Sequence, residues 1–154
     1  MAIGNGPRSY SASPARAINK AIVMAANAED ADSAALVFVY GSLKRGQANH
    51  HVLKGGRWLG TAVLAGLALY DLGPFPMAIA NGDATCSLEG EVYAVGAALL
   101  ERLDRFEGAP RLYQRQAHAL ADGRTVWVYV GRARQVRHVR RIPSGCWTGP
   151  RSAD

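Results

Sequence analysis

LVFVYGSLKRG, residues 36–46, begins as a buried strand and ends as a polar loop. Its first residues are apolar, β-branched or aromatic, which is typical of a strand inside a core. The apolar run stops at Tyr40-Gly41, and the chain turns polar and basic within three residues. Backbone N–H groups of such a glycine-containing loop can converge on one point and bind a carboxylate or the oxygen of a polarised carbonyl. The role of the loop therefore depends on whether the rest of the chain supplies a catalytic group.

The chain around this stretch has the size and composition of one globular domain. It has 154 residues, of which 49% are apolar and 19% charged. A chain of this length buries roughly 68–70% of its unfolded surface without disulfides or metals. No apolar run reaches the roughly 20 residues of a membrane span. We expect a domain over residues 34–150, preceded by a partly helical or disordered extension over residues 1–33.

The N-terminal extension is open to three interpretations. Residues 1–28 contain basic residues and no acid, and their Ala-rich run resembles a secretory signal weakly and a transit peptide equally. Ser13-Pro14 instead suits a helix N-cap followed by proline at the first helical position. We favour this helical interpretation, with the segment outside the functional core.

The formal charge of +6 is concentrated near the C-terminus. Residues 1–131 hold 12 of the 18 basic residues against 11 of the 12 acids, so most of the chain is nearly neutral. This argues against a uniformly basic nucleic-acid surface, and a solvated strand face or tail explains the arginine run better. Two cysteines, Cys86 and Cys146, are too few for a disulfide scaffold, and they predict free thiols in a reducing cytoplasm.

Strand signals dominate the sequence after the loop. Residues 57–72 are rich in Val, Leu and aromatics and contain two glycines, as in the bent wall of a barrel. Residues 87–95 alternate, and Asp122-Gly123 between two further apolar runs predicts a hairpin. Residues 97–108 change to a helical period. Because strands and helices do not alternate regularly, the order predicts an α+β fold, a small mixed β-barrel with flanking helices.

Glu107 is the residue whose position is hardest to explain by a structural role. It ends the predicted helix just before Gly108, and a carboxylate at a helix C-terminus is disfavoured by about 0.3–1 kcal/mol. Four apolar residues (Leu99, Leu100, Leu103 and Phe106) share one face of that helix and hold its last turn near the rim of the core. A carboxyl group there tends to have a raised pKa, which suits a general acid or base. The alternative is a solvated surface glutamate. We expect Asp104, one turn earlier, to pair with Arg105 or Arg111.

Other catalytic motifs are missing from the sequence. Its four histidines include the adjacent pair His50-His51, but no Glu or Cys stands at a metal-ligand spacing from that pair. YGSLKRG lacks the glycine and lysine order of a phosphate loop, and no Gly-x-Ser-x-Gly elbow is present. We therefore expect neither a metal nor a cofactor.

Taken in order, VYGSLKRG, GEVYAV, LDRFEG and LYQR resemble the γ-glutamylcyclotransferase-like family, in particular its γ-glutamylamine cyclotransferase-like members. The resemblance covers about residues 35–148. IPSGCW at 142–147 also resembles a family ending in which an aspartate commonly stands at the place of Cys146. Residues 1–33 have no counterpart in this resemblance.

The resemblance implies a pocket between the loop and a catalytic glutamate. It assigns Glu107 as the catalytic acid/base, and Tyr113, Phe75 and Pro76 as pocket walls. The residues that bind the γ-glutamyl group are Tyr40, Gly41, Ser42 and Leu43. In the implied reaction the substrate's α-amine attacks its own γ-carbonyl, and 5-oxoproline and a free amine are released. The partner is then a small-molecule γ-glutamyl substrate, without a cofactor or a membrane.

Two alternatives to this enzyme stay open. The same fold and loop would serve a non-catalytic small-molecule binding or regulatory module, which would not require an ionisable carboxylate at position 107. Nucleic-acid binding through the C-terminal arginines ranks last, because Trp147 is the only aromatic residue close to them. The sequence leaves the leaving amine and the oligomeric state open.

Overall fold

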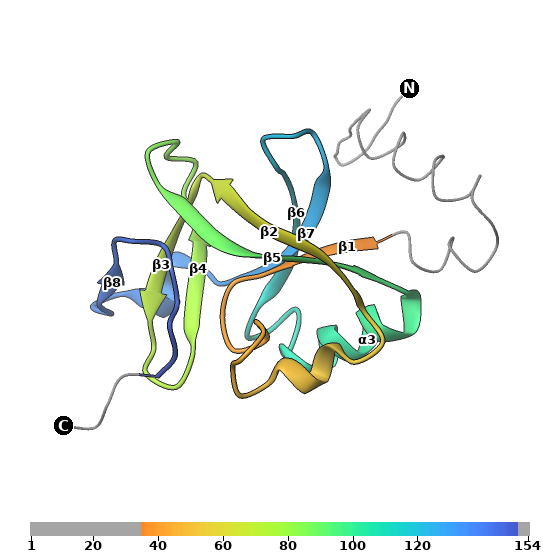
Figure 1. The fold of residues 1–154 in the computed structure, drawn as a ribbon. Coiled ribbons are helices and arrows are strands. Elements are labelled where there is room, and N and C mark those ends of the chain that lie inside the picture. Colours follow the sequence, from red (N-terminus) through yellow and green to blue (C-terminus); the bar gives the residue numbers. More distant parts are fainter. Residues whose placement is uncertain (1–34, 151–154) are drawn as a thin grey trace.

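A computed structural model describes residues 35–150 (Figure 1). The predicted extension over residues 1–33 lies outside the described residues, and the domain boundary at residue 34 stays a prediction. The elements, in chain order, are β1 (Ala35–Val39), the short 3-10 helix η1 (His50–Leu53), β2 (Arg57–Ala65), β3 (Leu67–Asp71), β4 (Pro76–Ala80), β5 (Ser87–Val95), α3 (Ala97–Phe106), β6 (Gln114–Ala119), β7 (Thr125–Val130), the 3-10 helix η2 (Ala133–Val136) and β8 (Arg141–Ile142).

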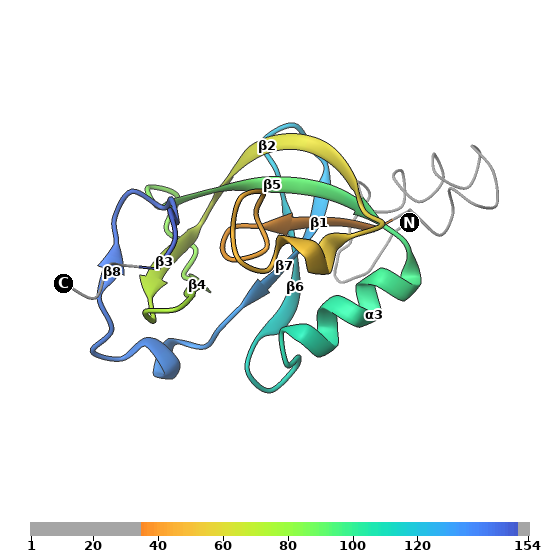
Figure 2. The same ribbon diagram turned by 60° about the horizontal axis from the view of Figure 1, so that its bottom comes forward.

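The strands form two sheets. Five strands pair in the order β2-β5-β1-β7-β6, and three pair in the order β4-β3-β8. β1 is antiparallel to β5 and parallel to β7, so the larger sheet is mixed. Helix α3 runs beneath this sheet, close to η1 (Figure 2). The α+β class predicted from the sequence is confirmed.

The small barrel that the sequence predicts is not closed, because the two sheets do not join into one. The cause lies in residues 57–72, which read as one bent strand and instead form two. The break falls at Gly66, whose φ of +90° is a left-handed conformation that glycine adopts at little cost. β2 stays in the larger sheet, while β3 turns away and pairs with β4 and β8.

Several local predictions are confirmed. β5 occupies residues 87–95, and β6 and β7 form the antiparallel hairpin around Asp122-Gly123. A register shift between Trp58 and Gly60 gives the expected irregularity in the first glycine-containing strand. β4 was not predicted, because its five residues follow directly on a proline-rich turn. It begins with Pro76, a position where a strand tolerates proline.

The core fixes where α3 ends. Leu99 and Leu103 are buried beneath the larger sheet, while Phe106 at the end of the same face is 40% exposed. The helix therefore leaves the core in its last turn. Within the residues that the structure describes, no helix is long and apolar enough to cross a membrane.

Candidate functional site

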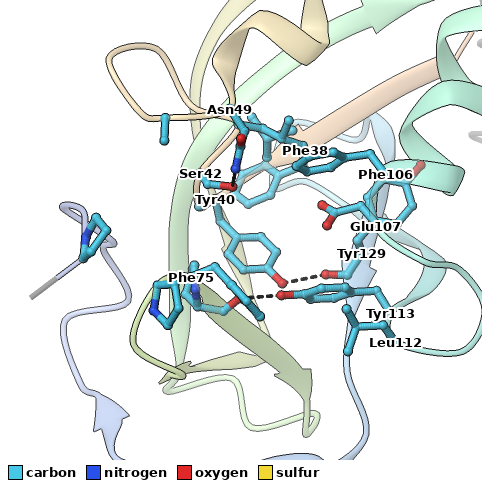
Figure 3. A pocket seen from close by; sticks show the side chains of 17 residues that line it. Phe38, Tyr40, Ser42, Asn49, Phe75, Phe106, Glu107, Leu112, Tyr113 and Tyr129 are labelled. Carbon is cyan, nitrogen blue, oxygen red and sulfur yellow. Dashed lines mark hydrogen bonds between the residues drawn. The ribbon is translucent and has the colours of Figure 1, made fainter.

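A pocket of about 430 Å³ opens where β1 ends, between the loop that follows it and the end of α3 (Figure 3). Clefts of roughly 300–1,000 Å³ typically hold small molecules. The pocket brings together all the site residues predicted from the sequence, which are Tyr40, Gly41, Ser42, Leu43, Phe75, Pro76, Glu107 and Tyr113. Their shared position is a finding, and their roles stay predictions.

Gly41 brings the loop close to the start of β4. A Cβ atom at this residue would lie 2.8 Å from Cγ and 2.9 Å from Cδ of Pro76, closer than real contacts allow. Gly41 does not have a positive φ. The glycine is therefore required by the close approach of the proline ring, and not by a left-handed backbone.

Hydrogen bonds fix the loop through its carbonyl groups. The backbone N–H of Lys44 donates to the Gly41 carbonyl (3.0 Å), and that of Asn49 donates to the Ser42 carbonyl (2.9 Å). The Asn49 side-chain amide also donates to the Ser42 hydroxyl (3.0 Å). No hydrogen bond within residues 35–150 uses the backbone N–H of Gly41, Ser42 or Leu43. These three donors belong to residues that line the pocket and stay available to a ligand.

The C-terminal segment supports the loop from outside. Lys44 Nζ donates to the carbonyl of Trp147 (2.7 Å), whose side chain is buried. Cys146 lies in a separate depression beside Glu89 and Glu91. Cys86 and Cys146 are both free thiols, as predicted.

Glu107 enters the pocket from the end of α3. It is the C-terminal cap of the helix, and Gly108 with a φ of +66° ends the helix directly after it. Figure 3 shows the carboxyl group of Glu107 pointing into the pocket. Burial raises the pKa of this carboxyl group to about 7. Within the described part of the chain no hydrogen bond reaches the carboxylate, so nothing there offsets the cost of burying its charge.

Two tyrosines that line the pocket donate their hydroxyl protons to backbone carbonyl groups. Tyr40 donates to the carbonyl of Tyr129 (2.6 Å) and accepts from the N–H of Ala78 (3.0 Å). Tyr113 donates to the carbonyl of Pro76 (2.8 Å). Burial raises the pKa of both phenols, so both stay protonated at neutral pH. The Tyr113 oxygen can still accept a hydrogen bond from a ligand.

A third tyrosine was not predicted. Tyr129 lines the pocket from β7 and donates its hydroxyl proton to Asp104 Oδ1 (2.7 Å). Asp104 also pairs with Arg115 Nε at 3.1 Å. The predicted pairing with Arg105 or Arg111 is therefore wrong. Residues 125–130 form a nearly continuous apolar run, so their pattern does not indicate which face of the strand carries Tyr129. Only the tertiary structure determines which cavity it reaches.

The mouth of the pocket contains further residues that sequence reasoning missed. Phe106 and Leu112 line it and are 40% and 44% exposed. Each is next in sequence to a predicted site residue, Glu107 or Tyr113, but neither carries a chemical signal of its own. Within residues 35–150, no group of three or more His, Cys, Asp or Glu side chains is placed to hold a metal.

A comparison with known protein families identifies the relatives of this fold. The model of the family described as gamma-glutamyl cyclotransferase, AIG2-like, matches residues 37–149. The chain belongs to this family. The resemblance inferred from the sequence motifs is therefore confirmed, and the family is one of enzymes.

Individual members of the γ-glutamyl cyclotransferase family cover the chain to different extents. The chain is 46% identical over 91 residues to the γ-glutamylaminecyclotransferase of Homo sapiens, a match that spans 53% of this chain and only 58% of the human protein. It is 37% identical over 113 residues to a putative γ-glutamylcyclotransferase of Vibrio cholerae, which spans 73% of this chain and 94% of that protein.

Solved structures of family relatives share the fold. An AIG2-like protein from Mus musculus superimposes with a TM-score of 0.61 at 28% identity, over 78% of this chain and 98% of the mouse chain. Protein YtfP from Escherichia coli superimposes with a TM-score of 0.56 at 33% identity, over 73% and 96%. Both matches cover most of the relative, so the two-sheet domain is the unit that these proteins share.

Proposed function

We propose that this protein is a γ-glutamylcyclotransferase that cleaves a γ-glutamyl amide by intramolecular attack. The products are 5-oxoproline and a free amine. The observation that carries this proposal is the carboxyl group of Glu107, which points into the pocket with a pKa of about 7. A group with a pKa near the working pH is suited to take up a proton and give it back within one catalytic cycle.

The chemistry follows from a substrate that contains its own nucleophile. The α-amine of a γ-glutamyl group is protonated at neutral pH and cannot attack in that form. Glu107 removes this proton, and the free amine bonds to the γ-carbonyl carbon to close a five-membered ring. The bond from that carbon to the amide nitrogen then breaks, and the proton held by Glu107 passes to the departing nitrogen. The ring nitrogen also loses its second proton, by way of Glu107, to the same amine, which leaves as an ammonium ion. No proton is gained or lost overall, and no external nucleophile takes part.

Backbone donors of the loop stabilise the negative charge of this reaction. The N–H groups of Gly41, Ser42 and Leu43 have no acceptor within residues 35–150. They bind the oxyanion that forms on the γ-carbonyl, or the α-carboxylate of the same substrate. Donors that are fixed before the reaction stabilise developing charge without reorganising, and one such donor typically contributes about 10²–10³-fold to kcat.

Acceptors opposite the loop orient the ammonium group. The hydroxyls of Tyr113 and Tyr129 donate to Pro76 and Asp104, so each oxygen keeps lone pairs that can accept from a ligand. A protonated α-amine held between these oxygens lies within reach of Glu107. Both phenols keep their own protons, since burial raises the pKa of each.

The γ-glutamylamine type of substrate is the finer part of this proposal. It is supported by the human relative, a γ-glutamylaminecyclotransferase, which shares 46% identity over the matched region. The amide bond cleaved would then join the γ-carboxyl of glutamate to a simple amine, and the amine would leave.

The test is release of 5-oxoproline from γ-glutamyl amides by wild type and by Glu107→Gln. The amide side chain is nearly isosteric but cannot accept the ammonium proton, so we expect turnover to fall by about 10²–10⁴-fold. Glu101→Gln, an exposed position on the same helix, is the matched control and should keep wild-type turnover. A folded Glu107→Gln variant with near-wild-type turnover would remove this residue from the mechanism. Tight binding of γ-glutamyl amides without turnover by wild type would favour a binding module instead.

A further inference from the structure

The mouth of the pocket is apolar in a way that the reaction itself does not require. Four large apolar side chains within residues 35–150 are markedly exposed, namely Leu59, Val63, Phe106 and Leu112. The first two lie apart on β2, and single exposed apolar residues are common on protein surfaces. Phe106 and Leu112 instead converge on one cavity, where exposed apolar surface indicates a binding site.

Phe106 and Leu112 lie where the leaving amine of the substrate is expected to extend. Phe106 precedes Glu107, and Leu112 precedes Tyr113. Figure 3 shows all four on one side of the pocket, with Ser42 and Phe75 across from them. Glu107 must reach the nitrogen that leaves, because it returns the proton to that atom. A group attached to this nitrogen therefore extends past Glu107 toward the exposed mouth of the pocket.

The charged residues of the pocket limit which substituents the leaving amine can carry. Among the described residues that line it, Glu107 is the only carboxylate, and there is no lysine or arginine. A leaving amino acid has a carboxylate one carbon from the scissile nitrogen, and that carboxylate would have no cationic partner in the lining. Burying an unpaired charge is costly. The pKa of Glu107 agrees with this, because burial alone accounts for its shift and no nearby cation lowers it.

We propose that the leaving amine carries an uncharged, apolar chain, and that Phe106, Leu112 and the ring of Phe75 form its subsite. The substrate class is then the γ-glutamyl amides of alkyl and arylalkyl amines. This inference rests on the proposed cyclotransferase reaction. It adds that the substrates of this protein release amines that carry no second charged group.

Phe75 gives the subsite its far wall. Its ring lies 6.4 Å, centroid to centroid, from the ring of Tyr113, at an interplanar angle of 55°. Phe75 is half-buried, so one edge of it stays available to a ligand. An alkyl chain between Phe75 on one side and Phe106 and Leu112 on the other removes apolar surface from water on both sides. Each added methylene then strengthens binding, by up to about threefold to fourfold where it is fully buried.

The experiment compares kcat/KM for 5-oxoproline release across a series of leaving groups. The series contains the γ-glutamyl amides of methylamine, butylamine, hexylamine and 2-phenylethylamine. γ-Glutamyl-alanine and the γ-glutamyl amide of the lysine ε-amine represent charged leaving groups. We expect kcat/KM to rise about tenfold or more from the methylamide to the hexylamide, and both charged compounds to be poorer substrates than the hexylamide.

Two variants and one control assign the effect to the subsite. Phe106→Ala and Leu112→Ala should each reduce the ratio of hexylamide to methylamide kcat/KM by at least threefold. Val63→Ala removes an apolar side chain that is 53% exposed on β2, away from the pocket, and should keep the wild-type ratio. Because both pocket positions are well exposed, either variant should fold, and circular dichroism checks this.

Different failures would have different meanings. A preference for γ-glutamyl-alanine or for the lysine amide would overturn the apolar subsite while leaving the cyclotransferase reaction intact. An unchanged chain-length ratio in both folded pocket variants would do the same. Absence of 5-oxoproline from every compound, including the methylamide, would overturn the proposed function itself and the subsite with it.

Discussion

Replacing Glu107 by glutamine should stabilise the protein at alkaline pH while it removes activity. The carboxyl group has a pKa of about 7 in the folded protein, against an ordinary value of 4.5 in the unfolded chain, and burial is the cause. The folded state therefore binds this proton more tightly than the unfolded state does. Between pH 4.5 and 7 the unfolded chain releases the proton first, so the free energy of unfolding falls as the pH rises through this window.

The size of the effect follows from the shift. One pKa unit corresponds to about 1.4 kcal/mol, so a shift from 4.5 to about 7 costs the folded state on the order of 3 kcal/mol above pH 7 and little below pH 4.5. Glutamine resembles the protonated carboxyl group and does not titrate. The difference in unfolding free energy between Glu107→Gln and wild type should therefore grow by about 2–3 kcal/mol from pH 5 to pH 8, in favour of the variant.

Urea denaturation of both proteins at pH 5 and pH 8 measures this difference. Groups that titrate equally in the two proteins cancel when the two are compared at one pH. Glu101→Gln on the exposed face of α3 controls for the loss of one negative charge from the same helix. If Glu107→Gln gains no more over wild type at pH 8 than at pH 5, the carboxyl group is not desolvated in the pocket, and the reasoning from its burial is refuted.

Three further outcomes are expected. In wild type, kcat/KM should fall below an apparent pKa of about 7 as Glu107 becomes protonated, and a flat profile from pH 5 to 8 would exclude it as the base. Gly41→Val should weaken binding of 5-oxoproline at least tenfold in a calorimetric titration, because its side chain collides with the ring of Pro76, 2.8 Å from the Cβ position; wild-type affinity in the folded variant would place the ligand elsewhere. Lys44→Met should raise KM several-fold with a smaller change in kcat, because it removes the 2.7 Å bond to the Trp147 carbonyl that supports the loop; unchanged steady-state kinetics would show that the bond is dispensable.

The features that the sequence predicted correctly are those with local causes. The strand at 87–95 shows alternation within nine residues, and the hairpin at residues 114–130 has its turn signal between two apolar runs. The end of α3 is similarly local, since Gly108 takes the positive φ that ends a helix. Glu107 was singled out on the same basis, as a carboxylate next to that glycine.

The features that the sequence did not reveal depend on contacts between distant segments. Whether residues 57–72 bend or break at Gly66 is decided by the partners available to β3, which come from β4 and β8. The partner of Asp104 likewise depends on which distant segment packs against α3. Arg115 reaches it from β6, whereas sequence proximity favoured nearer arginines. Periodicity predicts which face of an element is inward, but it does not predict which other element that face meets.

The hydrogen bonds of the tyrosines and the pKa of Glu107 are two aspects of one arrangement. A hydroxyl that donated into the pocket would stabilise the ionised carboxylate and lower its pKa. Tyr113 and Tyr129 instead donate to Pro76 and Asp104. The carboxylate receives no bond from them, and burial holds its pKa near 7. In the proposed reaction, the protons of these two hydroxyls stay bound to fixed acceptors, while the proton that moves would be held by Glu107, which binds and releases it with equal ease at neutral pH. The same burial lowers the stability of the folded protein above pH 7, so the role proposed for Glu107 is linked to a cost in folding free energy.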